Sequence, residues 1–282
     1  MKKSVLITGV SQGIGRGIAE RFLNEGYKLF GTFRTLKNGR TKAEELVEKY
    51  GAENVVLFGP YDFTNLEDTK KFVEKAACYN YDAVVCNAGM FSGNDDFNSF
   101  NLDDFTSVMN CNFYTPLIIT TGLKDCINEG GSIVIISSND AYPGAFASMS
   151  YSISKSALLS LMKCLSVNYG PRKIRVNSVA PGAIDTAMNT SEQMEISPYF
   201  SPIARFGTPK DVAKVVFFLS SDEAGFISGE NITIDGGYSI ESVLLKSEAD
   251  PNLSILLRSF ISCPEVIDVI KDYTKTKGLV IE

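Results

Sequence analysis

The chain has 282 residues, 44% of them hydrophobic and 21% charged, with a formal net charge of −6. This length allows one large core, and the mixed charges exclude a basic face for a nucleic acid duplex. The absence of histidine excludes Ser-His-Asp hydrolases, Cys-His proteases and His-ligated metal sites. The six cysteines are scattered along the chain and are expected to be reduced. Without histidine and without closely spaced cysteines, no metal site is predicted.

Short apolar runs alternate with amphipathic segments of helical period along most of the chain. This alternation is typical of β-α-β units, whose strands form a parallel sheet. It predicts an α/β fold, a single doubly wound domain over residues 1–240 with a seven-stranded parallel sheet. The predicted strands are Ser4–Thr8, Tyr27–Phe33, Asn54–Phe58, Ala83–Asn87, Ser132–Ser137, Arg175–Val179 and Asn231–Ile234.

A glycine-rich turn follows the first predicted strand. Gly9, Gly13 and Gly15 have the spacing G-x-x-x-G-x-G and precede a helical run that includes Ile18. Glycines here let the backbone approach a pyrophosphate, and the N–H groups at the start of the helix attract its charge. The place of the turn favours a dinucleotide site in a Rossmann-type fold over the alternative, a purely structural turn.

The second predicted strand ends in Gly31-Thr32-Phe33-Arg34, with Lys37 and Arg40 close behind. An acid at this position usually binds the ribose 2′-hydroxyl of NAD, whereas a base accepts the 2′-phosphate of NADP. Because Arg34 can bind a phosphate through two N–H groups, NADP(H) is favoured over NAD(H). The alternative is a solvated basic loop.

Two helix starts carry capping signals. Thr64-x-x-Glu67 predicts a capping box, and Thr208 is predicted to be the N-cap of a helix with Pro209 at its first position. Apolar ridges predict that helices cover the sheet. These ridges are Ala43, Leu46, Val47 and Tyr50 in one helix and Phe72, Val73 and Ala76 in another.

Pro116 predicts an interrupted helix at Asn112. Because proline has no N–H, the carbonyl of Asn112 lacks its usual helical donor, and a bound water is the obvious replacement. Asn110 is the alternative residue, but Pro116 is not its i+4 partner.

Tyr151 and Lys155 stand four residues apart in a segment of helical period, so both are expected on one helix face. A phenol has a pKa of about 10, and proton transfer near pH 7 requires this to fall by about three units, or about 4 kcal/mol. A neighbouring ammonium and the positive nicotinamide ring of a bound cofactor together favour the phenolate and can lower that pKa. The pair predicts a catalytic tyrosine, and the alternative is a half-buried tyrosine beside a solvated lysine.

About forty residues follow Asp235-Gly236-Gly237, where the sheet is expected to be complete. Residues 241–282 are predicted to form a C-terminal helical extension that packs on its own domain or joins subunits, with coverage of the active site as the alternative. Its apolar positions repeat at i, i+3, i+4 and i+7, as Leu253, Leu256, Leu257 and Phe260, and then as Val266, Val269, Ile270 and Tyr273.

With Thr8 before it, the glycine turn resembles that of the short-chain dehydrogenase/reductase family. Later motifs extend the resemblance from about Ser4 to Gly237. They are Cys86-Asn87-Ala88-Gly89 after the fourth strand, Ser138 thirteen positions before Tyr151, Tyr151-x-x-x-Lys155, and Ala180-Pro181-Gly182 after the sixth strand.

The resemblance implies four catalytic residues. Tyr151 is the general acid/base, and Ser138 hydrogen-bonds the substrate carbonyl oxygen, while the hydroxyl of Ser137 is expected to face the backbone. Lys155 holds the ribose and lowers the pKa of Tyr151, and Asn112 holds a water that connects Lys155 to solvent.

The resemblance also implies a cofactor site. Asp62 holds the adenine, Asn87-Ala88-Gly89 supports the sheet near the cofactor, and Ile184 and Thr186 meet the nicotinamide carboxamide. Many NADP-preferring relatives have a base at the position of Gln12. The expected cofactor-binding residues are Gly9, Ser11, Gln12, Gly13, Ile14, Gly15, Arg34, Asp62, Phe63, Asn87, Ala88, Gly89, Tyr151, Lys155, Pro181, Gly182, Ile184 and Thr186.

These features predict an NADPH-dependent oxidoreductase that reduces a ketone to a secondary alcohol. The alternatives are an NAD-dependent alcohol dehydrogenase of the same fold and a non-catalytic dinucleotide-sensing protein. Three segments are similar to 3-oxoacyl-(acyl carrier protein) reductases, which adds acyl thioesters to the candidate substrates. They are Arg205 to Pro209, Phe218 to Asp222 and Ile227-Ser228-Gly229. Pocket walls that favour an apolar carbonyl compound are predicted at Met90, Phe91, Ala141, Tyr142, Phe146, Met149, Ile184, Met188 and Phe200.

The expected partner is a small carbonyl or alcohol molecule rather than nucleic acid or a membrane. The apolar run Val5-Leu6-Ile7 is too short for a signal segment or a membrane span, so a cytoplasmic location is expected. A homodimer or homotetramer is also expected.

Overall fold

The computed structural model describes residues 2–35, 38–92, 95, 97–144, 148–187 and 201–240. The predicted helical extension at 241–282, Lys37, and the wall residues Phe146, Met188 and Phe200 lie outside these ranges. Within the described ranges, no helix is long and apolar enough to cross a membrane, and no group of three His, Cys, Asp or Glu side chains could hold a metal ion.

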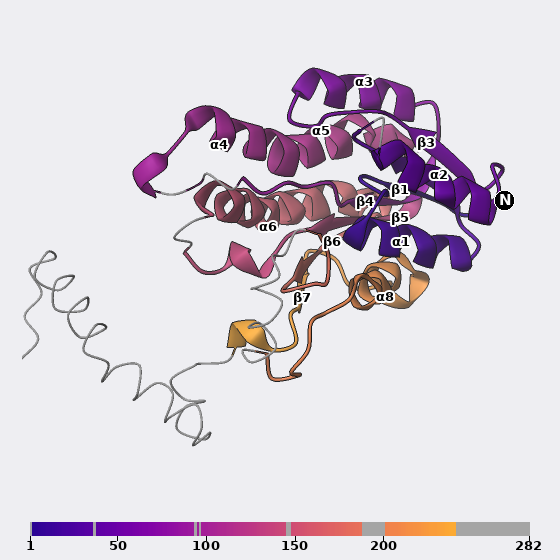
Figure 1. Ribbon diagram of the computed structural model, residues 1–282. Helices are drawn as coiled ribbons and strands as arrows, with labels where there is room; N and C mark the ends of the chain where they lie inside the picture. The colour runs from indigo at the N-terminus through magenta and orange to yellow at the C-terminus, as the bar shows by residue number, and fades with distance from the viewer. Residues whose placement is uncertain are drawn as a thin grey trace, which may run out of the picture.

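Seven parallel strands form one sheet in the order β3-β2-β1-β4-β5-β6-β7, which confirms the predicted fold class (Figure 1). From β1 the chain winds to one edge of the sheet and then returns to the other side of β1. A ligand crevice is expected where the order reverses, at the carboxyl ends of β1 and β4. The strands are β1 Ser4–Ile7, β2 Lys28–Thr32, β3 Val55–Phe58, β4 Tyr81–Cys86, β5 Ile127–Ile136, β6 Arg175–Pro181 and β7 Asn231–Ile234.

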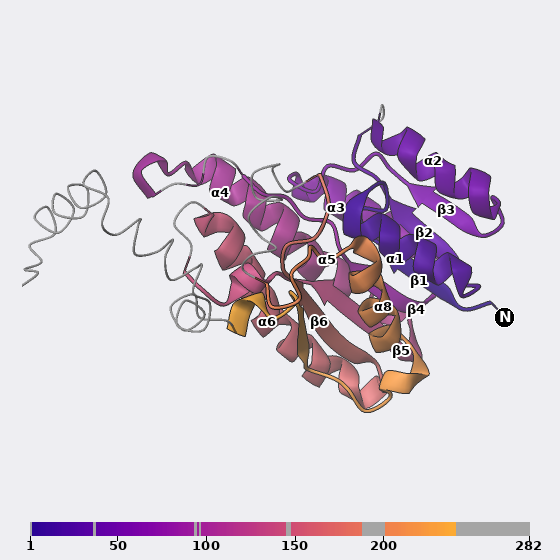
Figure 2. The same ribbon diagram turned by 60° about the horizontal axis from the view of Figure 1, so that its bottom comes forward.

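Helices cover both faces of the sheet (Figures 1 and 2). One face packs against α1 (Gly13–Asn24), α2 (Asn38–Tyr50) and α8 (Pro209–Ser220), and the other against α3 (Leu66–Ala76), α5 (Thr115–Gly122) and α6 (Met149–Tyr169). The predicted ridges are in these cores, with Ala43 and Leu46 on one face and Phe72 and Ala76 on the other. The remaining helical segments of the described residues are η1 Phe97–Ser99, α4 Leu102–Met109, the π-helical turn η2 Asn110–Tyr114, η3 Lys124–Cys126, η4 Asn139–Ala141, η5 Gly170–Arg172, η7 Asp222–Ala224 and η8 Tyr238–Ile240.

The strand boundaries differ most from the prediction at β5. The strand was predicted to begin at Ser132, but it begins at Ile127. The sequence placed the start too late because the strand passes through Gly130 and Gly131, two residues that are common in turns. Gly130 has a φ of +76°, and the pairing of β4 with β5 shifts register in this region. The shift in register accommodates the two glycines, and the strand continues beyond them.

One predicted cap is confirmed and the other is wrong. Thr208 forms a capping box with Asp211 at the start of α8. The Thr64 hydroxyl is instead 2.9 Å from Oδ1 of Asp62. The N-cap of α3 is Asn65, whose side chain accepts a hydrogen bond from the N–H of Glu67. The carboxylate of Asp62 thus holds Thr64, and the helix begins one residue later than the sequence predicted.

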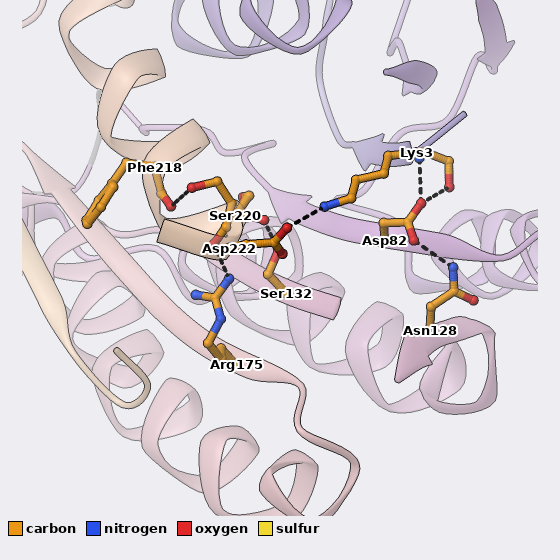
Figure 3. Close-up of polar contacts among 10 residues, drawn as sticks. Lys3, Asp82, Asn128, Ser132, Arg175, Phe218, Ser220 and Asp222 are labelled. Carbon is orange, nitrogen blue, oxygen red and sulfur yellow. Dashed lines mark hydrogen bonds and ion pairs between the residues drawn. The ribbon is translucent and has the colours of Figure 1, made fainter. Parts of the chain in front are cut away.

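Polar side chains close the amino edge of the sheet, opposite the expected crevice (Figure 3). Asp82 accepts hydrogen bonds from the N–H of Ser4 and from Asn128, at 2.7 and 2.9 Å. The buried guanidinium of Arg175 donates to the carbonyls of Leu219, at 2.6 Å, and Ser221, at 2.9 Å. These bonds satisfy carbonyls that the end of α8 leaves without helical donors. These hydrogen bonds support the amino edge of the sheet.

Candidate active site

The glycine turn lies between β1 and α1, at the carboxyl edge of the sheet. Gly9 and Gly13 have φ angles of +76° and +58°, which other residues rarely adopt. A Cβ at Gly15 would stand 2.0 Å from the Gly9 carbonyl oxygen and 2.4 Å from Nδ2 of Asn87. Gln12 is the N-cap of α1 but makes no side-chain cap bond, and the first turn holds no acid. The turn therefore leaves the start of α1 available to an anion.

Asn87 and Thr8 connect this turn to the end of β4. Nδ2 of Asn87 donates to the carbonyls of Thr8 and Gly9, at 2.9 and 3.2 Å. The Thr8 hydroxyl oxygen accepts from the N–H groups of Asn87, at 3.0 Å, and Ala88, at 2.9 Å. Four hydrogen bonds thus fix the Asn87-Ala88-Gly89 segment against the glycine turn, as the support predicted for this motif requires.

Basic side chains lie beyond the end of β2. Arg34 is exposed and pairs with no carboxylate among the described residues, whereas Arg40 forms an ion pair of 2.7 Å with Glu44. Lys42 donates to Oε1 of Gln12 over 3.4 Å. Among the described residues, Arg34 is therefore an exposed base at this strand end with no carboxylate partner, and its contact with a phosphate stays a prediction.

The structure separates two neighbours that were both expected to contact the cofactor. Asp62 is exposed just beyond β3, where its carboxylate accepts from the N–H and hydroxyl of Thr64. The ring of Phe63 is buried in the core and contacts Phe72 at a centroid distance of 5.7 Å. Only the backbone of Phe63 is left to contact a ligand.

Tyr151 and Lys155 lie in the first turns of α6, on one face as predicted. Nζ of Lys155 is 5.5 Å from the centre of the Tyr151 ring and donates to the carbonyl of Ile136 over 2.8 Å. Lys155 is buried, with 4% of its surface exposed. The last residue of β5 therefore holds the ammonium beside the tyrosine.

The two serines after β5 have different partners. The Ser137 hydroxyl donates to the carbonyl of Lys155 over 3.0 Å, which confirms its predicted backbone contact. Ser138 is hydrogen-bonded to the Tyr151 hydroxyl, and its own oxygen accepts from the N–H of Asp140 over 3.1 Å. Ser138 and Tyr151 can therefore contact the same substrate oxygen.

Asn112 lies in the π-helical turn between α4 and α5, where Pro116 predicted an interruption. Its side chain is buried, accepts from the N–H of Met90 over 2.8 Å and donates to the carbonyl of Met90 over 2.9 Å. It also donates to the Ser154 hydroxyl over 3.0 Å, which connects it to α6. The alternative residue, Asn110, donates to the carbonyl of Thr64 and lies outside this cluster.

Burial dominates the charge state of the tyrosine and the lysine. Desolvation raises the pKa of Tyr151 to about 12; the hydrogen bond with Ser138 opposes this change, and the charge of Asp140 adds to it. Desolvation also lowers the pKa of Lys155 to about 8, against smaller opposite effects of Cys111 and Asp140. The chain alone therefore does not have the lowered Tyr151 pKa, because desolvation outweighs the ammonium; the lowering predicted from Lys155 together with the nicotinamide charge stays a prediction.

Replacing Lys155 with methionine is expected to change how stability depends on pH. The ordinary lysine pKa of 10.5 falls to about 8 in the folded protein, so between these values the unfolded chain binds more protons. Wild-type stability should therefore rise with pH across this window relative to Lys155→Met, by roughly 3 kcal/mol at most. Urea unfolding of both proteins from pH 7.5 to 10.5 measures the difference, and parallel curves would contradict the buried ammonium.

The segment after β6 completes the site. The N–H of Gly182 donates to the carbonyl of Ile234 over 3.0 Å. Cγ2 of Thr186 is 3.4 Å from the position of a Cβ at Gly13, so Thr186 lies at the glycine turn. The side chain of Ile184 is buried with 3% exposed, which leaves its backbone groups to face a ligand.

The described wall residues differ in their exposure. Phe91 is 45% exposed and lies edge to face with Tyr151, with 5.7 Å between ring centres. Met90 and Met149 are partly buried, Ala141 is buried, and Tyr142 is exposed. Phe91 is therefore the apolar side chain placed directly beside the tyrosine.

Sequence reasoning missed two residues that hold this cluster. Ser154 connects Asn112 to α6 and donates to the carbonyl of Tyr151 over 2.7 Å. Asp95 accepts from the first turn of α6. Ser154 stands between Tyr151 and Lys155 in the motif and could have been considered, but no pattern in the sequence distinguishes Asp95 from other loop acids.

Comparison with known proteins shows similarity over nearly the whole described domain. A family model described as enoyl-(acyl carrier protein) reductase matches residues 9–239. The 3-oxoacyl-[acyl-carrier-protein] reductase FabG of Aquifex aeolicus is 34% identical over 246 residues, which cover 83% of this chain and 96% of that protein. Residues 9–239, which the family model matches, include the glycine turn and all four predicted catalytic residues.

Solved structures give the same result. A short-chain dehydrogenase/reductase from Serratia marcescens has a TM-score of 0.77 at 30% identity, covering 84% of this chain and 98% of its own. BdcA, solved in complex with NADPH, has a TM-score of 0.75 at 31% identity, covering 83% and 93% of the two chains. The likeness extends from the sheet to the elements that hold the candidate site.

Proposed function

Because the chain belongs to the short-chain dehydrogenase/reductase family, and is an oxidoreductase, we propose that it reduces a ketone to a secondary alcohol with NADPH. The observation that carries this proposal is the cluster of Ser138, Tyr151 and Lys155 at the carboxyl edge of the sheet. Carbonyl reduction requires a proton donor, a hydroxyl that binds the carbonyl oxygen and a cation nearby. Tyr151, Ser138 and Lys155 offer these groups in that order.

The residues of the glycine turn fit a nicotinamide dinucleotide. Gly9, Gly13 and Gly15 keep the backbone free of side chains, and the start of α1 offers N–H groups to a pyrophosphate. The bound cofactor supplies the hydride. Asn87 keeps the turn and the end of β4 together, so that the dinucleotide site and the catalytic residues hold their relative positions.

The side chains of the cluster have distinct roles in this proposal. Ser138 orients the substrate carbonyl oxygen, and Tyr151 protonates it. A phenol whose pKa is raised to about 12 holds its proton at neutral pH, which is the state that an acid needs. The ammonium of Lys155 stabilises the phenolate that forms and has further N–H donors for a ribose. Asn112 holds α6 and Met90 in place beside the proposed water.

The preference for NADPH is assigned to Arg34. Replacing Arg34 with glutamine should raise the Kd for NADPH about tenfold, because it removes a charge-assisted bond to the 2′-phosphate worth about 1.5 kcal/mol or more. The Kd for NADH should stay unchanged. Titrations of both cofactors measure this, with Arg40→Gln as the control because Arg40 is paired with Glu44. Equal losses for NADPH and NADH would remove the proposed role of Arg34.

The substrate is proposed to be an apolar carbonyl compound, because the exposed ring of Phe91 lies beside Tyr151. The name of the Aquifex relative adds acyl thioesters to the candidates. A screen of ketones, quinones and acyl thioesters with NADPH and with NADH tests the proposal. Turnover with NADH alone would favour the NAD-dependent alcohol dehydrogenase, and tight cofactor binding without turnover would favour a sensing protein.

The proposal extends to a cytoplasmic homodimer or homotetramer, with residues 1–240 as the catalytic domain and 241–282 as a separate extension. Light scattering of the full chain and of a chain ending at residue 240 would test this division. A smaller assembly with unchanged activity would place the extension in subunit contacts, whereas loss of activity alone would place it over the site.

A further inference from the structure

A buried carboxylate that the proposed mechanism does not use lies against the start of α6. Asp95 is 5% exposed, and Oδ2 of its side chain is 2.5 Å from both the N–H nitrogen and the hydroxyl of Ser150. The N–H of Tyr151 is a third donor, at 3.4 Å. Asp95 is also paired with Ser148 in an isolated parallel bridge. Three donors from two residues therefore converge on one carboxylate oxygen beside the catalytic tyrosine.

The start of α6 depends on this distant residue for its cap. The local N-cap of α6, Ser148, makes no side-chain cap bond. By contrast, α3, α4 and α8 are capped by Asn65, Asn101 and Thr208, which directly precede them. The N–H groups of a first helical turn have no helical acceptor, and the helix dipole favours an anion there. A carboxylate from the segment after β4 fills this role for α6.

The same segment is held at its other end by Asn112. The Asn112 side chain bonds both the N–H and the carbonyl of Met90, and the ring of Phe91 lies against the Tyr151 ring. Asp95 fixes the backbone of Tyr151, and Phe91 contacts its side chain. The wall of the substrate site and the acid/base are thereby joined at two points.

We propose that Asp95 is a positioning residue for Tyr151. Its carboxylate holds the first turn of α6 so that the Tyr151 hydroxyl keeps its place relative to Ser138 and Phe91. This inference rests on the proposed function of Tyr151 as the acid. The position of the hydroxyl affects proton transfer to the substrate, while the glycine turn that binds the dinucleotide belongs to other elements. Loss of the Asp95 carboxylate should therefore lower kcat much more than it weakens NADPH binding.

Three variants test the proposal. Asp95→Ala removes the acceptor, and Asp95→Asn retains an acceptor oxygen of the same reach. Asp103→Ala is the control, since Asp103 is an exposed acid in the first turn of α4. The kcat per NADPH-binding site of Asp95→Ala should be about 10- to 100-fold lower than that of wild type, because a misplacement of a reacting group by about 1 Å can lower the rate by this much. Asp95→Asn should recover most of this kcat. The solvent deuterium isotope effect on kcat should be larger in Asp95→Ala than in wild type. Asp103→Ala should behave as wild type in both measurements.

A measurement that does not depend on turnover completes the test. Hydrogen exchange at the amides of Ser150 and Tyr151 should be faster in Asp95→Ala than in Asp95→Asn, and the Tyr151 ring resonance should shift. Normal kcat per binding site in Asp95→Ala, with only lower stability, would overturn the proposal and leave Asp95 as a structural cap. Slow exchange at both amides in Asp95→Ala would overturn it as well. If wild-type protein reduced no carbonyl compound, the proposed function would fail, and the exchange and ring data would still decide whether Asp95 positions Tyr151.

Discussion

Replacement of Tyr151 with phenylalanine is expected to lower kcat by about 10²- to 10⁴-fold, the range that a positioned general acid contributes. The variant lacks only the hydroxyl, and the ring can still pack against Phe91. Tyr151 is itself an expected cofactor contact, but the glycine turn lies on other elements, so the Kd for NADPH should rise by no more than about tenfold, the loss of one hydrogen bond. Steady-state kinetics with the best substrate of the screen, together with NADPH titration, measure both quantities.

A matched control comes from the far end of the same helix. The Tyr169 hydroxyl donates to the carbonyl of Thr120, away from the cluster. Tyr169→Phe should therefore lose stability but keep its kcat per NADPH-binding site. Equal turnover by Tyr151→Phe and wild type would require a different proton donor.

Replacement of Gly15 with alanine is expected to weaken NADPH binding by up to about 100-fold. The new Cβ would stand 2.0 Å from the Gly9 carbonyl oxygen and 2.4 Å from Asn87 Nδ2, so the turn or its support must move. Overpacking of this kind costs about 1–3 kcal/mol, and each 1.4 kcal/mol taken from binding is about tenfold in Kd. NADPH titration and urea unfolding separate the loss of affinity from the loss of stability.

Gly170→Ala is the control for this substitution. Gly170 has a φ of −52°, and a Cβ there would meet nothing within 4 Å. It should therefore change neither stability nor NADPH affinity by a measurable amount. NADPH binding by Gly15→Ala with wild-type affinity would show that the close approach at the glycine turn is not required.

The parts of the fold that depend on short-range patterns could be predicted from the sequence. Apolar runs located all seven strands, and the i, i+4 spacing placed Tyr151 and Lys155 on one helix face. The missing N–H of Pro116 predicted the interruption that the structure contains as a π-helical turn at Asn112. Each of these features follows from the period or the chemistry of neighbouring residues.

Features that depend on packing could not be predicted in this way. The position of Phe63 beside Asp62 gave no sign that its ring belongs to the core. The cap that Asp95 provides joins residues more than fifty positions apart. The pKa of Tyr151 is set by burial, which the distance from Lys155 along the chain does not reveal. In each case the deciding interaction is between segments far apart in the sequence.

The most direct test of NADPH-dependent carbonyl reduction follows the hydride itself. Wild-type protein and Tyr151→Phe are incubated with a panel of ketones and NADPH deuterated at C4 of the nicotinamide ring, and the products are analysed by mass spectrometry. NADPH-dependent carbonyl reduction predicts that wild-type protein forms a secondary alcohol with deuterium at the carbinol carbon, and that Tyr151→Phe forms almost none. A wild-type protein that binds NADPH but transfers no deuterium to any ketone, or a variant that transfers it equally fast, would contradict it.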